Sequence, residues 1–296
     1  MPRRRTSALV TALALAGAVP LFMPAGEASA AACSSYPAWS AGANYNTGDI
    51  VRYTDGKAYI AEHPNPGYDP LISTWYWDPY ACDGGSGTPV GNFVVSEAQF
   101  NQMFPGRNSF YTYSGLTAAL SAYPGFANTG SDTTKKQEAA AFLANVGHET
   151  GGLVHIVEQN TANYPHYCDG SRPYGCPAGN DAYYGRGPMQ LSWNYNYKAA
   201  GDALGINLLN NPWLVQNDSA VAWKTALWYW NTQSGPGSMT GHNAMVNGAG
   251  FGQTIRSING SVECDGKNPA QVQSRVTKYQ QFSQILGVSP GGNLYC

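Results

Sequence analysis

The sequence predicts a mainly helical α+β domain preceded by a small all-β domain. Three observations support this division. Helix-start patterns recur through residues 92–296, residues 33–82 carry strand and hairpin signals, and a Gly/Ser/Pro-rich stretch at 83–91 lies between them as a flexible linker. The 296 residues are enough for a domain of about 200 residues and a smaller one.

The first thirty residues have the pattern of a secretory signal peptide. Arginines at 3–5 precede an apolar run at 8–23, and Ala28-Ser29-Ala30 follows as a small-residue cleavage site. The apolar run is too short and too interrupted to anchor the chain in a membrane. We therefore expect cleavage after Ala30 and secretion of residues 31–296 from the cell.

Charge composition limits the partners. The chain has 16 Lys and Arg, 18 Asp and Glu and a net charge of −2, which is not the basic surface that binds nucleic acids or anionic membranes. Aromatic residues make up 12% of the chain and charged residues 11%. This balance suits a neutral, hydroxyl-rich ligand such as a sugar, although packing in a core explains many of the aromatics equally well. We expect a monomer that binds neither nucleic acid nor membrane.

The six cysteines indicate disulfides, because exported proteins meet an oxidising environment. They cluster along the chain as Cys33 with Cys82, Cys168 with Cys176, and Cys264 with Cys296, and this clustering suggests those pairings among the ones that six cysteines allow. A zinc site is the alternative, but the sequence has no C-x-x-C and no paired histidines nearby. We therefore expect no metal and no cofactor.

Residues 33–82 contain two strand-like runs, 49–53 and 57–61, joined by an Asp55-Gly56 turn signal. Trp39, the segments 45–51 (Tyr-Asn-Thr-Gly-Asp-Ile-Val) and 56–61 (Gly-Lys-Ala-Tyr-Ile-Ala), and Trp75 follow in order. This pattern resembles the small chitin-binding modules of carbohydrate-binding families 5 and 12. The resemblance implies that residues 31–82 form a chitin-binding module.

The aromatic side chains of this part are the candidates for sugar binding. Many such modules place adjacent Trp residues after the second strand, where this chain has Glu62-His63-Pro64. Binding would then depend on four aromatic residues, Tyr68, Trp75, Tyr76 and Trp77. For Trp39, Tyr59 and Trp77 taken singly, a position in the core is the favoured alternative.

Helix signals follow in residues 92–296. Ser96 and Gln99 form a capping-box pattern for a short helix, and Thr134 and Gln137 form one for a longer helix at 134–149. Residues 218–230 and 269–286 predict two more helices. The stretch 150–200 is rich in Gly, Asn, Pro and Tyr, so we expect loops with short strands there, and loops on a helical scaffold are common places for sites.

Two carboxylates are candidates for acid–base chemistry. Phe142, Val146 and Glu149 share one helix face, which places Glu149 on the buried side of a helix C-terminal end. Burial and the helix dipole both favour the protonated carboxyl group that a general acid needs, although a structural pair with an Arg is an equal alternative. Gly151-Gly152 should break the helix, so that Glu158 can face Glu149 across one cleft. Enzymes that hydrolyse glycosidic bonds typically use two such facing carboxyl groups.

Motifs of other enzyme classes are incomplete. His148-Glu149 resembles the start of a zinc-protease helix, but Gly152 stands where the second His would be. The sequence has no Gly-x-Ser-x-Gly elbow and no phosphate-binding loop, and Gly185-x-Gly187 lacks the rest of a dinucleotide fingerprint.

Three longer motifs occur in order at 148–152 (His-Glu-Thr-Gly-Gly), 183–196 (Tyr-Tyr-Gly-Arg-Gly-Pro-Met-Gln-Leu-Ser-Trp-Asn-Tyr-Asn) and 258–264 (Ile-Asn-Gly-Ser-Val-Glu-Cys). They resemble the glycoside hydrolase family 19 chitinases, and the resemblance covers essentially all of 92–296. It implies a two-lobed, lysozyme-like catalytic domain that cleaves β-1,4 bonds between N-acetylglucosamine units and inverts the anomeric carbon. The length of about 205 residues is similar to the compact bacterial members, which lack several loops of the plant enzymes.

The resemblance also implies residue roles. Glu149 matches the general acid, Glu158 the general base and Ser192 the residue that helps to hold the attacking water. Gln190, Tyr195, Asn196 and Asn259 match residues that touch sugar, and Glu263 and Arg275 match a charged pair that supports the acid. Inversion predicts carboxyl groups roughly 6.5–9.5 Å apart, with water between them.

Three functions remain open at this point. The first is a secreted, inverting endo-chitinase that degrades chitin, with a chitin-binding module in front. The second is a muramidase-like hydrolase of peptidoglycan, which the acidic net charge argues against because such walls are anionic. The third is a non-catalytic chitin-binding or antifungal protein, which the loss of a catalytic carboxylate would favour, but both Glu149 and Glu158 are present.

Overall fold

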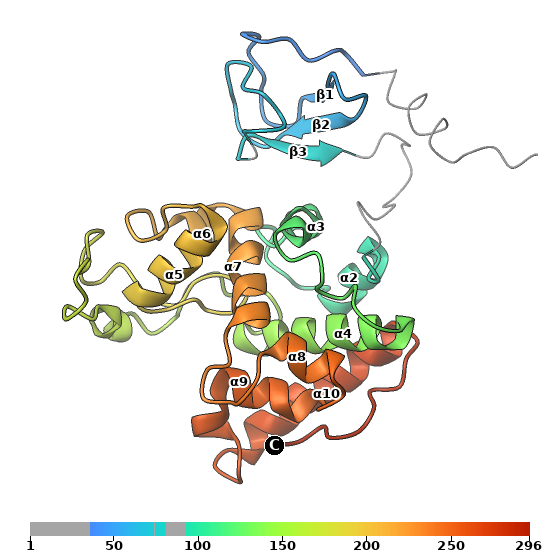
Figure 1. Ribbon diagram of the computed structural model, residues 1–296, viewed down its shortest axis with the longest axis vertical. Coiled ribbons are helices and arrows are strands. Elements are labelled where there is room, and N and C mark those ends of the chain that lie inside the picture. Colours follow the sequence, from blue (N-terminus) through green and yellow to red (C-terminus); the bar gives the residue numbers. More distant parts are fainter. Residues whose placement is uncertain (1–35, 74, 81–92) are drawn as a thin grey trace, which may run out of the picture.

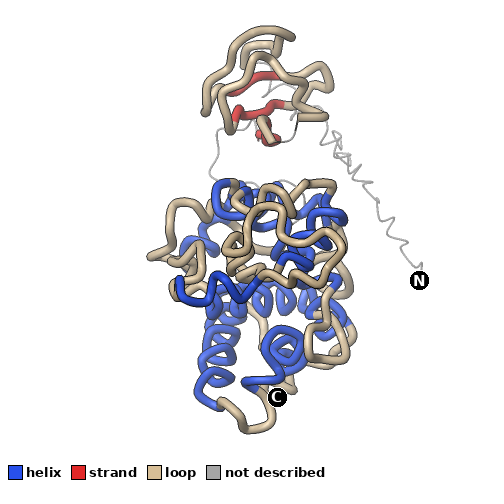
Figure 2. The backbone as a smooth tube through the Cα atoms, turned by 90° about the vertical axis from the view of Figure 1, so that its left-hand side faces the viewer, coloured by secondary structure: helices blue, strands red, loops and turns tan. Residues whose placement is uncertain are grey.

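The computed structural model describes residues 36–73, 75–80 and 93–296. The predicted signal peptide, the predicted linker 83–91, Cys33 and Cys82 lie outside these residues. Strands are confined to the first part of the chain and long helices to the second (Figures 1 and 2).

The strands are β1 (Ile50–Arg52), β2 (Ala58–Ala61) and β3 (Trp77–Tyr80). The α-helices are α2 (Glu97–Met103), α3 (Tyr113–Ala119), α4 (Asp132–Glu149), α5 (Asn194–Leu204), α6 (Leu214–Asn217), α7 (Ser219–Thr232), α8 (Gly241–Val246), α9 (Phe251–Glu263) and α10 (Pro269–Ile285), and η1 (Leu120–Ala122) and η2 (Thr161–Tyr167) are 3₁₀ helices.

The strands form a three-stranded antiparallel sheet in the order β1-β2-β3. β1 and β2 lie within the two runs expected from the sequence, and Gly56 between them has a φ of +82°, which glycine adopts without strain. Val51, Tyr59, Ala61 and Trp77 form the core of this part. Trp77 is 1% exposed and donates from Nε1 to the carbonyl oxygen of Tyr68 at 2.7 Å. The prediction that Trp77 binds sugar on the surface is therefore wrong, and its alternative as a core residue is right.

The main core of the helical part surrounds α4. Ten consecutive residues of this helix, 138–147, are buried, because α10 packs along it and α7, α8 and α9 cover its other sides. Phe142 lies at the centre, with ring centroids 5.0 Å from Phe126 and 5.5 Å from Trp230. Burying aromatic rings of this size contributes much of the hydrophobic stabilisation of a core.

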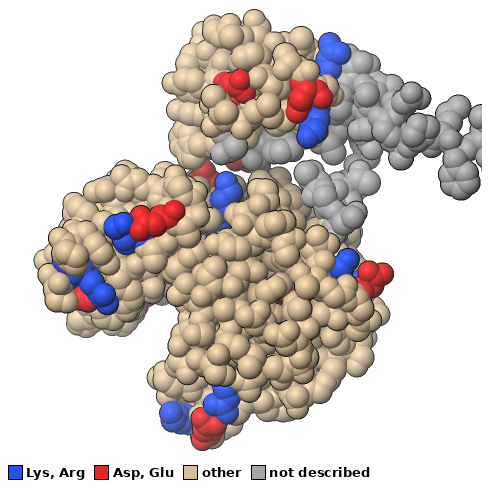
Figure 3. Space-filling model, viewed as in Figure 1, with Lys and Arg blue, Asp and Glu red and all other residues tan. Residues whose placement is uncertain are grey.

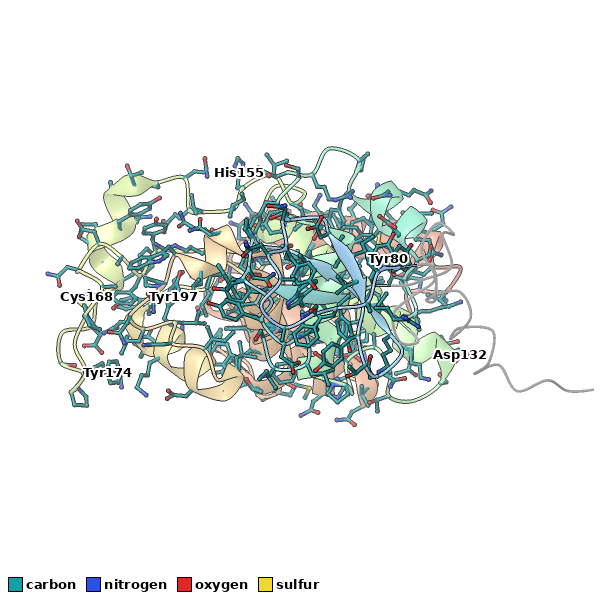
Figure 4. The ribbon with its side chains drawn as sticks, turned by 90° about the horizontal axis from the view of Figure 1, so that it is seen from above. Tyr80, Asp132, His155, Cys168, Tyr174 and Tyr197 are labelled. Carbon is teal, nitrogen blue, oxygen red and sulfur yellow. A yellow bond between two sulfur atoms is a disulfide. The ribbon has the colours of Figure 1, made fainter. Side chains whose placement is uncertain are left out.

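A second core lies beside the first. It contains Tyr183, Leu191, Tyr197, Leu208 and residues of α6 and α7. α7 belongs to both cores, with Trp223 and Trp230 in the first and Ala222 and Trp228 in the second. In Figure 4, Cys168 and Tyr174 lie at the opposite end from Asp132, the first residue of α4. The helical part is therefore two-lobed, and α7 joins the lobes.

Among the described α-helices the sequence predicted α2, α4, α7 and α10, and three of these four start where expected. Ser96 caps α2 with both hydrogen bonds of a capping box, Asp218 caps α7, and Pro269 opens α10. α4 begins earlier than expected, because Ser131 rather than a residue near Thr134 is its N-cap. The stretch 150–200 contains η2 and the first half of α5 besides loops, and its only strand-like pairs among the described residues are the bridges Val157–Arg186 and Arg186–Leu191.

Two disulfides are formed among the described residues, Cys168–Cys176 and Cys264–Cys296. The first closes a loop of the second lobe, and the second joins the C-terminal residue to the end of α9. Both are pairs that the clustering of cysteines suggests. No helix in the described part of the chain is long and apolar enough to span a bilayer.

Candidate active site

Glu149 is the last residue of α4, at the point where the helix is forced to stop. Gly151 and Gly152 have φ values of +63° and +88°, and the Gly152 amide donates to the Gly147 carbonyl at 2.7 Å. The buried Thr150 hydroxyl donates to the Val146 carbonyl and accepts from the Leu153 amide, both at 2.7 Å. These bonds satisfy the end of the helix and turn the chain away from it, as the Gly-Gly pair predicted.

The side chain of Arg275, in α10, reaches the Glu149 carboxylate. Its Nη2 donates to Glu149 Oε1, and the same guanidinium donates to Glu263 through Nε and Nη2, each at 2.8 Å. Nη1 donates at 3.0 Å to Oδ1 of Asn145, a residue one helical turn before Glu149. The Arg275 side chain is fully buried, the Glu263 side chain is 6% exposed, and the Glu149 side chain is 16% exposed. Glu149 is thus the solvent-facing end of a buried polar cluster.

The cluster fixes the charge state of its inner members. Burial alone would raise the pKa of Glu263, but hydrogen bonds and charge from Arg275 outweigh it, with Asn259 adding a hydrogen bond at 2.9 Å, so the pKa is lowered. Burial likewise opposes the charge of Arg275, yet its two carboxylate partners raise the pKa of the guanidinium. Burial, then the neighbouring Arg275, lowers the pKa of His148 to about 4, so His148 is neutral near pH 7.

Glu158 lies in the loop that follows the helix break. Its backbone amide donates to the Gly185 carbonyl at 2.8 Å, and its carbonyl accepts from the Tyr164 hydroxyl at 3.0 Å. Oε1 accepts from Asn163 Nδ2 at 2.7 Å. Oε2 is buried and has no hydrogen-bond partner among the described residues. Burial, followed by the interaction with Glu158, raises the pKa of Tyr167 to about 12, which places this hydroxyl near the same carboxylate.

Gln190 and Ser192 lie in the turn before α5, and Asn196 lies in the first turn of that helix. The Ser192 hydroxyl donates to the Gln190 carbonyl at 2.8 Å, and Asn196 Nδ2 donates to the Ser192 carbonyl at 2.9 Å. Gln190 has a φ of +48°, and its Nε2 donates to the Gly187 carbonyl at 2.9 Å. A Cβ at Gly185 would lie 3.0 Å from Gln190 Oε1 and 3.4 Å from Ser192 Oγ, so a larger residue would fit there only if these side chains shifted.

Tyr195 and Asn259 occupy different surroundings. Tyr195 stacks on Trp193 at 5.5 Å, and the Arg172 guanidinium lies 4.9 Å from its ring centroid. Asn259 has non-helical φ and ψ inside α9, and this kink directs its amide to Glu263. Figure 3 shows the surface hollowed between the lobe with α5 and α6 and the lobe with α9 and α10, beside the end of α4.

Three contributors to the site were missed from the sequence. Asn145 is fully buried and lies one turn before Glu149 on the same helix face, so a polar residue at an apolar position was the available signal. His148 was considered only as part of an incomplete zinc-protease motif and of the motif 148–152, although it contacts Ser274 at 3.2 Å next to Arg275. Asn163 gave no signal beyond its closeness to Glu158 along the chain. Among the described residues, no three His, Cys, Asp or Glu side chains converge as a metal site would require.

Aromatic side chains of the strand-containing part also gather on its surface. Tyr68 is 43% exposed and Trp75 is 41% exposed, and Tyr76 is half-buried between them, 4.6 Å from each ring. His63 stacks on Trp75 with centroids 4.0 Å apart and planes 14° apart. Three of the four predicted binding residues of this part are therefore together, and His63 belongs to the same aromatic group.

Comparison with known proteins agrees with this geometry. A family model described as chitinase class I matches residues 94–296. Endochitinase A of Zea mays is 47% identical over 211 residues, covering 69% of this chain and 71% of that protein. The crystal structure of chitinase C from Streptomyces griseus HUT6037 is 73% identical with a TM-score of 0.68, covering 72% of this chain and all of that one. A bacterial family 19 chitinase of known structure is 85% identical with a TM-score of 0.69, covering 69% of this chain and all of that one.

The helix-rich, two-lobed fold is of the lysozyme-like type, and together with these relatives it identifies a glycoside hydrolase. With the family model covering 94–296 and these relatives, the chain belongs to the glycoside hydrolase family 19 chitinases.

Proposed function

We propose that this chitinase is a secreted, endo-acting enzyme that hydrolyses β-1,4 bonds between N-acetylglucosamine units by a single displacement with inversion. The observation that carries the proposal is the contrast between the two carboxylates. Glu149 ends a buried polar cluster at a helix C-terminus, whereas Glu158 lies in a polar loop and keeps one buried oxygen without a partner. Different environments for two carboxylates suit them to opposite tasks in acid–base catalysis.

Glu149 is the proposed general acid. Arg275 is already paired with Glu263 through two hydrogen bonds, so the buried cluster is electrically neutral when Glu149 carries its proton. An ionised Glu149 would add a net negative charge at the C-terminal end of α4, where the helix dipole opposes it. Protonation of the leaving oxygen by Glu149 would generate that charge only as the glycosidic bond breaks, with Arg275 in place to stabilise it.

Glu158 is the proposed general base, and Ser192 helps to hold the water that it activates. The Ser192 side chain lies close to the Glu158 segment, since a Cβ at Gly185 would contact Ser192 Oγ and the Gly185 carbonyl binds the Glu158 amide. A hydroxyl can both donate and accept, which suits a residue that orients water. Gln190, Tyr195, Asn196 and Asn259 are the proposed sugar contacts.

The first part of the chain is the proposed chitin-binding module, tethered through the segment 83–91. Tyr68, Trp75 and Tyr76 supply the exposed aromatic surface on which sugar rings could stack. Tethering would raise the local concentration of the catalytic domain on an insoluble polymer. We also propose that residues 1–30 are a signal peptide that is removed on export.

The product anomer tests the mechanism. Chitohexaose hydrolysis is followed by proton NMR, and the anomer is identified before mutarotation mixes the two forms. We expect initial α-product, because one displacement at a β-linkage inverts the anomeric carbon. Initial β-product would mean a covalent intermediate and would overturn the roles given to Glu158 and Ser192.

A further inference from the structure

The Glu158 carboxylate is held asymmetrically. Asn163 Nδ2 donates to Oε1 at 2.7 Å, while Oε2 is buried and has no donor within hydrogen-bond distance among the described residues, although the Tyr167 hydroxyl interacts with the same carboxylate. A buried carboxylate oxygen without a partner is costly, since desolvation is not repaid by a hydrogen bond. In an enzyme such an atom is explained most simply by a ligand that binds there during the reaction.

Asn163 is itself held by a short, well-anchored segment. Asn160 caps η2 by accepting from the Ala162 amide at 3.3 Å, and the Asn163 amide donates to the Asn160 carbonyl at 3.0 Å. Within the same turn the Tyr164 hydroxyl donates to the Glu158 carbonyl at 3.0 Å. The side chain and the backbone of Glu158 are therefore both fixed by η2, the element that follows it in the chain.

A stack of three planar groups connects η2 to the turn that carries Ser192. Tyr164 stacks on Tyr184 with centroids 3.7 Å apart and planes 10° apart, and the Arg186 guanidinium lies 3.6 Å from the Tyr184 centroid. Arg186 is 3% exposed and donates to Gln216 Oε1 at 2.6 Å and to the Tyr197 hydroxyl at 2.7 Å. The stack thus ties the loop of Glu158 to the second core.

We propose that Asn163 and Tyr164 are positioning residues that select the reactive oxygen of Glu158. This inference rests on the proposed role of Glu158 as the base. Asn163 occupies Oε1, so Oε2 is the oxygen that takes a proton from the attacking water. The water oxygen forms the new bond to the anomeric carbon, the bond from that carbon to the leaving oxygen breaks, and the leaving oxygen receives the proton of Glu149.

The other ionisable groups that face the Glu158 carboxylate do not titrate in the acidic limb of the pH–rate profile. Tyr164 and Tyr167 face it from η2, and Arg186 lies behind Tyr184 on the other loop. Burial is the first cause that raises the pKa of both tyrosines, so they stay neutral at the pH of the assay, and Arg186 stays charged. A change in the acidic limb of the rate profile therefore reports on Glu158.

The central test is Asn163→Ala, with Asn160→Ala as the matched control. Both variants truncate an asparagine of the same segment, but only Asn163 touches the carboxylate. For Asn163→Ala we expect kcat on a soluble chitooligosaccharide to fall about 10- to 100-fold, the effect of a lost hydrogen bond to a charged group, with KM within about twofold. The acidic limb of kcat/KM should move to higher pH, because the ionised base has lost a donor. Asn160→Ala should keep the position of the wild-type limb.

Tyr164→Phe provides a second, independent measurement, with Tyr184→Phe as its control. Each change removes one hydroxyl and keeps the ring stack, but only the Tyr164 hydroxyl binds Glu158; that of Tyr184 binds Gln216 at 3.1 Å. We expect a fall in kcat of about threefold to tenfold for Tyr164→Phe alone. Equal falls in the two variants would assign Tyr164 a structural role only.

The outcomes separate this inference from the proposed function. If Glu158→Ala is inactive while Asn163→Ala matches Asn160→Ala in kcat and in pH profile, the positioning role is overturned and the base assignment stands. If Glu158→Ala retains wild-type turnover, the proposed function fails and the inference fails with it. An inactive Glu158→Ala together with a low kcat and a shifted limb for Asn163→Ala supports both.

Discussion

Arg275 is fully buried and hydrogen-bonds to three side chains, Glu149, Glu263 and Asn145. Asn145 and Glu149 lie on α4 and Glu263 lies on α9, and their side-chain oxygens match the donors of one planar guanidinium. Lysine could not replace this fork geometry, since a single ammonium does not present donors in a plane. The position of Glu149 at the end of α4 therefore depends on α10 and α9 as much as on α4 itself.

Glu149→Gln tests the role of the acid. The amide keeps the size of the side chain but has no carboxyl proton to give to the leaving oxygen. We expect hydrolysis of chitooligosaccharides to fall by on the order of 10²- to 10⁴-fold, the usual contribution of a general acid, while retention on chitin is unchanged. Substantial residual turnover in a folded variant would mean that another group protonates the leaving oxygen.

Arg275→Met tests the buried cluster as a source of stability. The change leaves Glu263 buried without its cationic partner, and we expect the free energy of unfolding in urea to fall by about 3–5 kcal/mol. Arg256→Met is the control, because Arg256 pairs with the exposed Asp265 at 2.6 Å on the surface, where screening by solvent leaves little stabilisation. A similar small loss in both variants would contradict a stabilising cluster.

At the scale of elements, a second buried carboxylate joins α4 to α7 and α8. Glu138 of α4 is fully buried; its Oε1 accepts from Trp230 Nε1 at 3.0 Å and lies 2.7 Å from His242 Nδ1, and its Oε2 accepts from the Ala127 amide at 2.9 Å. Ala127 has a φ of +47°, so this hydrogen bond also fixes a strained turn. This group of contacts was not predicted, because a Glu inside a helix is an ordinary surface residue until its neighbours are known.

This contact predicts a pH dependence of stability. The hydrogen bond to Glu138, against the opposing effect of burial, raises the pKa of His242 above its usual 6.5. The contribution of His242 to the stability of the fold is therefore fully present below the pKa of the unfolded state and is lost as the pH rises through the pKa of the folded state. We expect His242→Gln to lower the free energy of unfolding more at about pH 5.5 than at about pH 9. The same deficit at both values would show that His242 contributes by packing alone.

The predicted helices succeeded where a local cap was available. Ser96 with Gln99, Asp218 and Pro269 each act within one turn of the chain, so the sequence contains the whole interaction. At α4 two cap-forming residues compete: Ser131 is chosen and Thr134 lies in the first turn, where its amide donates to the Ser131 hydroxyl at 3.1 Å. The helices α3, α5, α6, α8 and α9 were not predicted. Of these, α3, α6 and α8 are short, and packing rather than propensity stabilises such short elements.

At the scale of the whole molecule, the strand-containing part has its own core of Val51, Tyr59, Ala61 and Trp77 and its own exposed aromatic group. We expect a chain without residues 31–91 to keep wild-type turnover of soluble chitooligosaccharides and to lose activity on insoluble chitin. The loss follows from a lower local concentration on the polymer. Parallel assays on both substrates check this, and an equal loss on both would refute the division of labour.

The sequence by itself determined the family, the starts of α2, α7 and α10 and the break after Glu149, because each depends on residues close together in the chain. It also gave Glu158 as the candidate for the second carboxylate. Only the tertiary structure decided that Trp77 is buried, and it gave the contact by which Arg275, already expected from the resemblance to support the acid, reaches Glu149 from a helix 126 residues further on. Burial and long-range hydrogen bonds depend on which elements pack together, and that choice is made by the whole core rather than by any one segment.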